Sequence, residues 1–102
     1  TALTPSTSFA CNLSLTNLSG LNLSHTNLSG SILSSTNLSG ANLRFANLRG
    51  SNLRGSNLNG ADLTGADMTD SRLNGLRANN LIGCPSSLPD GWVCENNSLI
   101  QR

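Results

Sequence analysis

The residues that could do chemistry in this chain are few, and the sequence does not bring them together. His25 is the only histidine among 102 residues, and lysine and tyrosine are absent. The acidic residues all come late in the chain and are Asp62, Asp67, Asp70, Asp90 and Glu95. A metal centre or a catalytic site needs several such groups in one place. We therefore expect no metal ligand and no cofactor, and we expect His25 to be a surface residue.

Serine is abundant, but its pattern is not that of a nucleophile. The chain has no Gly-x-Ser-x-Gly motif, and no His–Asp pair is placed to activate a hydroxyl. Ser14, Ser19 and Ser24 begin a series that recurs every five residues, which indicates a solvent-facing strand position. We expect no catalytic residue and no enzyme activity.

Two of the three cysteines, Cys84 and Cys94, enclose the stretch "CPSSLPDGWVC". Two prolines and the Asp90-Gly91 pair favour a turned loop there, which can bring the two sulfurs together. A disulfide at this point would be typical of an oxidising compartment. The alternative is a pair of free thiols in a cytosolic protein. For Cys11, which is far from both in the sequence, we expect a buried free thiol.

Charge and hydropathy argue against several classes of protein. The formal net charge is +1 and only 11% of residues are charged, so nothing indicates a nucleic-acid partner or an anionic membrane surface. No apolar run approaches the roughly 18 residues that a membrane span needs, and we expect no membrane insertion. The chain has neither an initiator Met nor a signal-peptide pattern, so we expect a mature or trimmed chain.

The elements that position these residues follow from a repeat of five. An apolar residue stands at the centre of each repeat, and we expect these residues to form the core: Leu13, Leu18, Leu23, Leu28, Leu33, Leu38, Leu43, Leu48, Leu53, Leu58, Leu63, Met68 and Leu73. The residue two before each centre is nearly always small, and the flanking residues are polar. Glycine is the commonest residue two positions after the centre.

This pattern predicts a β-solenoid. Two inward residues separated by a polar one are typical of a short strand. The glycine supplies a corner with an unusual backbone conformation. Short strands and corners that alternate every five residues wind the chain into coils, which would stack at about 4.8 Å, the spacing of β-strands.

The repeats resemble the consensus A(N/D)LXX of the pentapeptide-repeat protein family. The stretches "ANLRF", "ANLRG", "ADLTG" and "ADMTD" carry the resemblance, which covers residues 11–75 without a gap. The resemblance implies an all-β fold, a right-handed quadrilateral β-helix of four pentapeptides per coil. About four coils would fit in this chain.

Four repeats per coil place residues twenty apart in one ladder. His25 would then lie at a corner beneath Phe45 and stack on it. Arg44, Arg49 and Arg54 would fall on three faces as a solvated belt. We expect these arginines to pair with acids one coil further on, at Asp62, Asp67 or Asp70.

The ends of the repeat suggest three regions. We expect a degenerate first coil or N-terminal cap at 1–10, the solenoid at 11–80, and a C-terminal cap with the disulfide loop at 81–102. Phe9 and Trp92 are the candidates for end contacts. Trp92 would cover the last coil, although a loop that presents Trp92 to a partner is an alternative.

The resemblance also bounds the function. One branch of the family inhibits DNA gyrase by imitating DNA with a strongly negative dimeric rod, whereas the acids here are outnumbered by arginines. Another branch has a short solenoid with a cysteine-bearing cap and includes thylakoid-lumen members. We expect a non-catalytic structural or protein-interaction solenoid, extracytoplasmic and self-associating end to end, with an unidentified protein partner. The alternative is a head-to-tail filament subunit, and a gyrase-binding DNA mimic is the weaker third.

Overall fold

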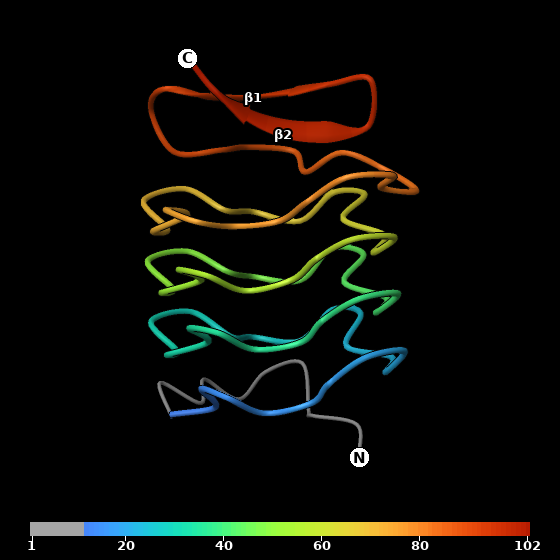
Figure 1. The fold of residues 1–102 in the computed structure, drawn as a ribbon, viewed down its shortest axis with the longest axis vertical. Helices are drawn as coiled ribbons and strands as arrows, with labels where there is room; N and C mark the ends of the chain where they lie inside the picture. Colours follow the sequence, from blue (N-terminus) through green and yellow to red (C-terminus); the bar gives the residue numbers. More distant parts are fainter. Residues whose placement is uncertain (1–11) are drawn as a thin grey trace.

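The computed structural model describes residues 12–102 as a stack of coils closed by a small hairpin (Figure 1). The only strands in this part of the chain are β1 (Trp92–Glu95) and β2 (Ser98–Gln101), which pair antiparallel. The coils below them are joined by single parallel β-bridges. The expected all-β class is confirmed. The N-terminal region 1–10 and the proposed end contact Phe9 lie outside the described residues, as does Cys11.

The bridges follow the twenty-residue spacing that four repeats per coil require. Asn12 pairs with Ile32, Ile32 with Asn52, and Asn52 with Arg72. Three further ladders begin at Asn17, Asn22 and Asn27. Backbone N–H groups on each coil donate to the next coil, as Leu43 does to Asp62 O at 2.8 Å. The coils are therefore held together by hydrogen bonds along all four ladders.

Each corner is a β-turn whose third residue has a positive φ angle, the feature of a type II turn. In one such turn the N–H of Leu21 donates to Leu18 O, and Gly20 has φ +69°. Leu15 and Phe45 take the same conformation with φ of 60° and 58°, which costs a non-glycine residue about 1–2 kcal/mol. The serines after the central leucines lie in these turns. The sequence-based assignment of that position to a strand was wrong.

The core is a column of the central apolar residues. From Leu23 to Leu73 each of them is at most 2% exposed, and Ala, Ser and Thr fill the small positions between them. Leu13 and Leu18, nearest the N-terminal end of the described chain, are only partly buried. Among residues 12–102 no helix is both long and apolar enough to cross a membrane.

The twenty-residue spacing is interrupted by a β-bulge on the last coil, and it returns at the next bridge, from Asp67 to Ser87. Asp62 bridges to Gly83, which is one residue more than the usual spacing. The N–H of Ile82 donates to Ala61 O, whereas Gly83 O accepts from Leu63, so Ile82 is the extra residue. Its side chain is 71% exposed.

The hairpin closes the C-terminal end of the stack (Figure 1). The hairpin is tied to the last coil by two backbone hydrogen bonds, from Leu99 N–H in β2 to Ala78 O at 3.0 Å and from Leu81 N–H to Asn97 O in the turn at 2.9 Å. Leu81 and Leu99 join the core, and Trp92 packs against it. The hairpin therefore covers the apolar end of the column, as a cap at this position would.

Candidate functional site

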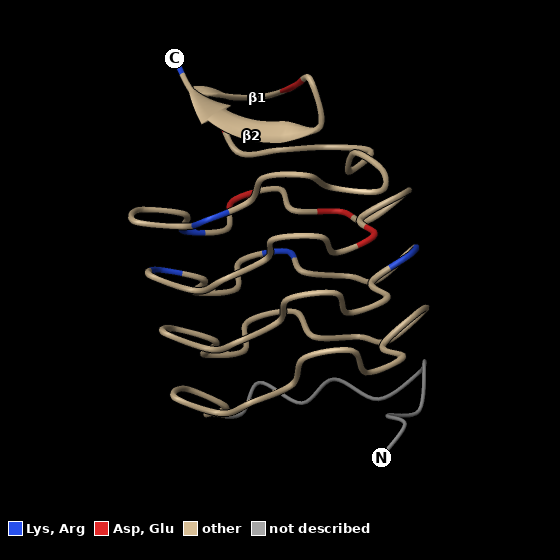
Figure 2. Cartoon of the chain, turned by 45° about the vertical axis from the view of Figure 1, so that its right-hand side comes forward, with Lys and Arg blue, Asp and Glu red and all other residues tan. Residues whose placement is uncertain are grey.

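The charged side chains gather in the C-terminal half of the stack. Figure 2 shows the coils nearest the N-terminus without charge and the coils below the hairpin with both signs. Between residues 12 and 43 the chain has no Asp, Glu, Lys or Arg. Ion pairs among the described residues can therefore form only within residues 44–102.

Two of the arginines in the belt pair with acids on the next coil. Arg44 Nη1 lies 3.2 Å from Asp62 Oδ2, and Arg49 Nη1 lies 3.1 Å from Asp67 Oδ2. These two pairings from the sequence are confirmed. Arg54 differs, because the residue at the corresponding position is Arg72, and Arg54 has no ion pair within residues 12–102. Both pairs have an exposed arginine and each contributes about 0–1 kcal/mol.

The two paired carboxylates are held in the ionised form. The hydroxyls of Ser87 and Thr69 each donate to Asp67 Oδ1 at 2.6 Å and lower the pKa of Asp67 well below 3.8. Burial raises the pKa of Asp62, but the hydroxyl and the N–H of Thr64 outweigh it and the net pKa is lowered. Neither carboxyl can act as a proton donor near neutral pH.

His25 stacks on Phe45, which confirms the sequence-based expectation. The ring centroids are 5.2 Å apart with 19° between the planes, and the Arg44 guanidinium lies 5.6 Å from the Phe45 centroid. Phe45 also covers Gly65, where an added Cβ would lie 2.4 Å from two ring carbons. We call His25, Arg44, Phe45 and Gly65 the aromatic corner. Phe45 is 52% exposed, and it is the largest exposed ring in the part described.

The asparagine ladders are structural. Asn22 Oδ1 accepts the Ser24 N–H at 3.1 Å and the Ser24 hydroxyl at 2.7 Å. The same pair of bonds joins Asn17 to Ser19 and Asp67 to Thr69. Sequence reasoning missed this role, although the repeated Asn/Asp-x-Ser/Thr spacing is the signal that could have shown it.

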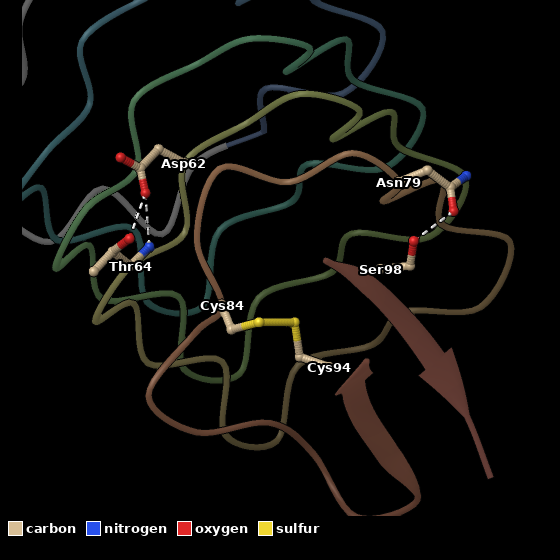
Figure 3. The surroundings of a disulfide bond; sticks show 6 residues. All are labelled: Asp62, Thr64, Asn79, Cys84, Cys94 and Ser98. Carbon is tan, nitrogen blue, oxygen red and sulfur yellow. Dashed lines mark hydrogen bonds between the residues drawn. A yellow bond between two sulfur atoms is a disulfide. The ribbon is translucent and has the colours of Figure 1, made fainter. Parts of the chain in front are cut away.

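The cap contains the disulfide between Cys84 and Cys94, with a Cα–Cα distance of 6.1 Å (Figure 3). Nearby, the Ser98 hydroxyl donates to Asn79 Oδ1 at 3.0 Å and links β2 to the last coil. Within residues 12–102 no group of three His, Cys, Asp or Glu side chains is placed to hold a metal ion. The chemistry on this surface is hydrogen bonding, ion pairing and aromatic contact.

Comparison with known proteins agrees with this architecture. The family model "Pentapeptide repeats" matches in eight copies, over residues 11–50 and 36–75. A pentapeptide repeat protein from the thylakoid lumen of Arabidopsis thaliana is similar in structure, with a TM-score of 0.72 and 27% identity over 79% of this chain and 58% of that chain. No curated protein sequence matches significantly.

A second solved structure is HetL, a pentapeptide repeat protein involved in heterocyst differentiation regulation in the cyanobacterium Nostoc. It has a TM-score of 0.61 and 31% identity over 74% of this chain and 33% of that chain. The chain thus spans less than two thirds of either relative. The family implies a right-handed quadrilateral β-helix, which agrees with the four ladders of bridges.

Proposed function

This chain belongs to the pentapeptide repeat family, and on that basis we propose that it is a non-catalytic interaction solenoid of an extracytoplasmic compartment. The observation that carries the proposal is the use of its polar side chains. Asparagine and aspartate side chains hold turns, the acids Asp62 and Asp67 pair with arginines, and His25 stacks on Phe45. The described surface is thus a rigid, nearly neutral wall suited to contact with another protein.

Two observations support a location outside the cytoplasm. The Cys84–Cys94 disulfide is of a kind that persists in oxidising compartments. The similar Arabidopsis thaliana protein comes from the thylakoid lumen. The test is to block free thiols in intact host cells with a maleimide, before and after reduction. We expect Cys84 and Cys94 to label only after reduction, with Cys11 as the internal control for a free thiol, and labelling of all three without reduction would contradict the location.

We further propose that the protein self-associates end to end. Leu13, Leu18 and Leu21, nearest the N-terminal end, are only partly buried. The residues one coil further on are fully buried, and they are Leu33, Leu38 and Ala41. At the opposite end, Leu99 and Trp92 already pack against the column. This asymmetry favours contact through the N-terminal end over a head-to-tail filament, in which both ends must take part.

The test is light scattering of the unreduced protein over a concentration series, with negative-stain electron microscopy. Pairing through the N-terminal end predicts a doubled mass at high concentration that Phe9→Glu abolishes and Trp92→Glu leaves unchanged. A filament predicts long particles that either substitution disperses. A monomer at every concentration would exclude both forms of self-association.

The distribution of charge does not favour a gyrase-binding DNA mimic. Such a mimic needs a continuous negative surface, whereas Asp62 and Asp67 are paired with arginines and residues 12–43 contain no Asp or Glu. Supercoiling by purified gyrase is expected to continue unchanged when the protein is added.

A further inference from the structure

The chain has two Asn-Gly pairs in matching turns, and the two pairs differ in their hydrogen bonds to the rest of the protein. Asn59-Gly60 and Asn74-Gly75 both follow a central leucine, and in both the glycine has a positive φ, of 75° and 74°. The hydrogen bond that closes the turn is 3.0 Å in each case. The carbonyl of each asparagine accepts an N–H from the coil below, at 3.0 Å for Asn59 and 2.9 Å for Asn74.

The difference lies in what the coil above provides. At the first pair, the backbone of Asn79 holds both groups that would react in deamidation. Its N–H donates to Asn59 Oδ1 at 2.9 Å, and its carbonyl accepts the Gly60 N–H at 3.0 Å. At the second pair no coil continues above, and within residues 12–102 the Gly75 N–H and the Asn74 side chain have no hydrogen-bond partner. Asn74 and Gly75 are both exposed.

We propose that Asn74 is a site of spontaneous deamidation and that Asn59 is protected from it. The Gly75 nitrogen attacks Asn74 Cγ, a new N–Cγ bond forms, and the bond from Cγ to the side-chain nitrogen breaks. Ammonia leaves with the proton from the Gly75 nitrogen, and a cyclic succinimide remains. Water then opens either carbonyl of the ring, and the product is aspartate or isoaspartate.

The product changes the charge beneath the cap. A carboxylate at residue 74 lies one ladder step from Arg54, and two residues from Arg72 along the chain. Neither arginine has an acidic partner in the described part of the chain. Deamidation therefore supplies the missing acid on this side of the last coil and reduces the net charge of the chain from +1. This inference does not depend on the proposed function.

The experiment is to age the folded, full-length protein in mildly alkaline buffer at physiological temperature. Trypsin cuts after Arg54, Arg72 and Arg77, so the two asparagines fall in separate peptides that mass spectrometry can follow. We expect Asn74 to convert at least about tenfold faster than Asn59, because two hydrogen bonds must first break at Asn59. Equal rates, or faster loss of Asn59, would overturn the proposal.

Two controls show whether structure sets the ratio. In denaturant both pairs are Leu-Asn-Gly sequences without tertiary contacts, so their rates are expected to converge. A ratio that persists in denaturant would show that the fold is not the cause. Asn74→Gln, at an exposed side chain, removes most of the conversion and assigns the product; unchanged conversion in this variant would overturn the assignment.

Discussion

Residues 12–77 and residues 78–102 hold the same column of coils together by different means. In the first region every five residues repeat one β-bridge position, one turn and one central apolar residue, and each coil bonds to the next through all four ladders. In the second region the spacing slips at Ile82, and an antiparallel hairpin replaces the next coil. The hairpin is held in place by a disulfide and by two apolar side chains, Leu99 and Trp92, that pack on the core. A coil in the middle of the column is held by the coils on either side of it.

Repetition of the same coil stabilises the middle of a solenoid but cannot stabilise its end. A coil in the middle has hydrogen-bond partners and apolar contacts on both sides, whereas the last coil has them on one side only. The C-terminal segment supplies the missing contacts with residues that do not follow the repeat. Substitutions in the two regions are therefore expected to differ in size and in how far their effects spread.

The largest expected effect is the loss of a leucine from the middle of the column. Leu43→Ala removes a side chain with 0% exposure and is expected to destabilise the protein by about 2–5 kcal/mol, because the rigid coils cannot close the cavity. Leu99→Ala, at 9% exposure on the hairpin, is the matched control and is expected to cost less. Urea unfolding followed by circular dichroism measures both, and an equal loss would mean that the hairpin is as integral as a coil.

The second-largest expected effect on stability is the loss of the disulfide in the cap. Cys84 and Cys94 are ten residues apart, and by the chain-entropy estimate their bond contributes about 2–3 kcal/mol. The double variant Cys84→Ser/Cys94→Ser is expected to lose that amount mostly within the cap. Hydrogen exchange would then rise at the amides of Leu81 and Leu99 and stay unchanged at Leu43. A uniform rise along the column would show instead that the cap and the coils unfold together.

Acid is expected to destabilise the folded protein through Asp62 and Asp67. The pKa values of Asp62 and Asp67 are lowered in the folded protein, so the stability they add is present above the ordinary value of 3.8 and is lost as the pH falls through the folded values. Unfolding free energy is therefore expected to decline from about pH 4 downward. Asp62→Asn/Asp67→Asn should flatten this decline, since Asn42 and Asn47 occupy the same ladders.

The control for the acid experiment is Asp70→Asn. Asp70 has no ion pair within residues 12–102, and its corner conformation with φ 61° is one that asparagine tolerates. We expect this variant to keep the acid dependence of the parent protein. If Asp70→Asn flattens the decline as much as the double variant does, the stabilisation does not come from the two hydrogen-bonded carboxylates.

Much of the column could be predicted from the sequence because its period is set by local geometry. Every fifth residue is a central apolar residue, and a spacing of twenty brings His25 to Phe45 and Arg44 near Asp62. These contacts need only the period and the number of repeats per coil.

The bulge and the turns could not be predicted in the same way. Ile82 continues the count of five after Arg77, yet Gly83 takes the bridge position. An added Cβ at Gly83 would lie 1.9 Å from Thr64 Oγ1, so the requirement for glycine comes from a residue on the coil below. The turn position of the serines was missed because a polar residue beside a buried leucine looks the same in a strand and in a turn.

The smallest expected effect on stability is that of replacing a buried serine, and it can be compared at two serines one coil apart in the same inward ladder. Ser31 and Ser51 are both 0% exposed, but the Ser51 hydroxyl donates to Leu48 O at 2.7 Å, whereas the Ser31 hydroxyl has no partner among the described residues. Ser51→Ala is expected to cost about 0.5–1.5 kcal/mol. Ser31→Ala removes an unpaired buried hydroxyl and is expected to leave stability unchanged or to raise it by up to about 1 kcal/mol. Paired urea unfolding curves would measure the difference, and an equal loss in both variants would mean that the Ser31 hydroxyl finds an acceptor in solution, most simply the Leu28 carbonyl that already accepts its N–H at 3.1 Å.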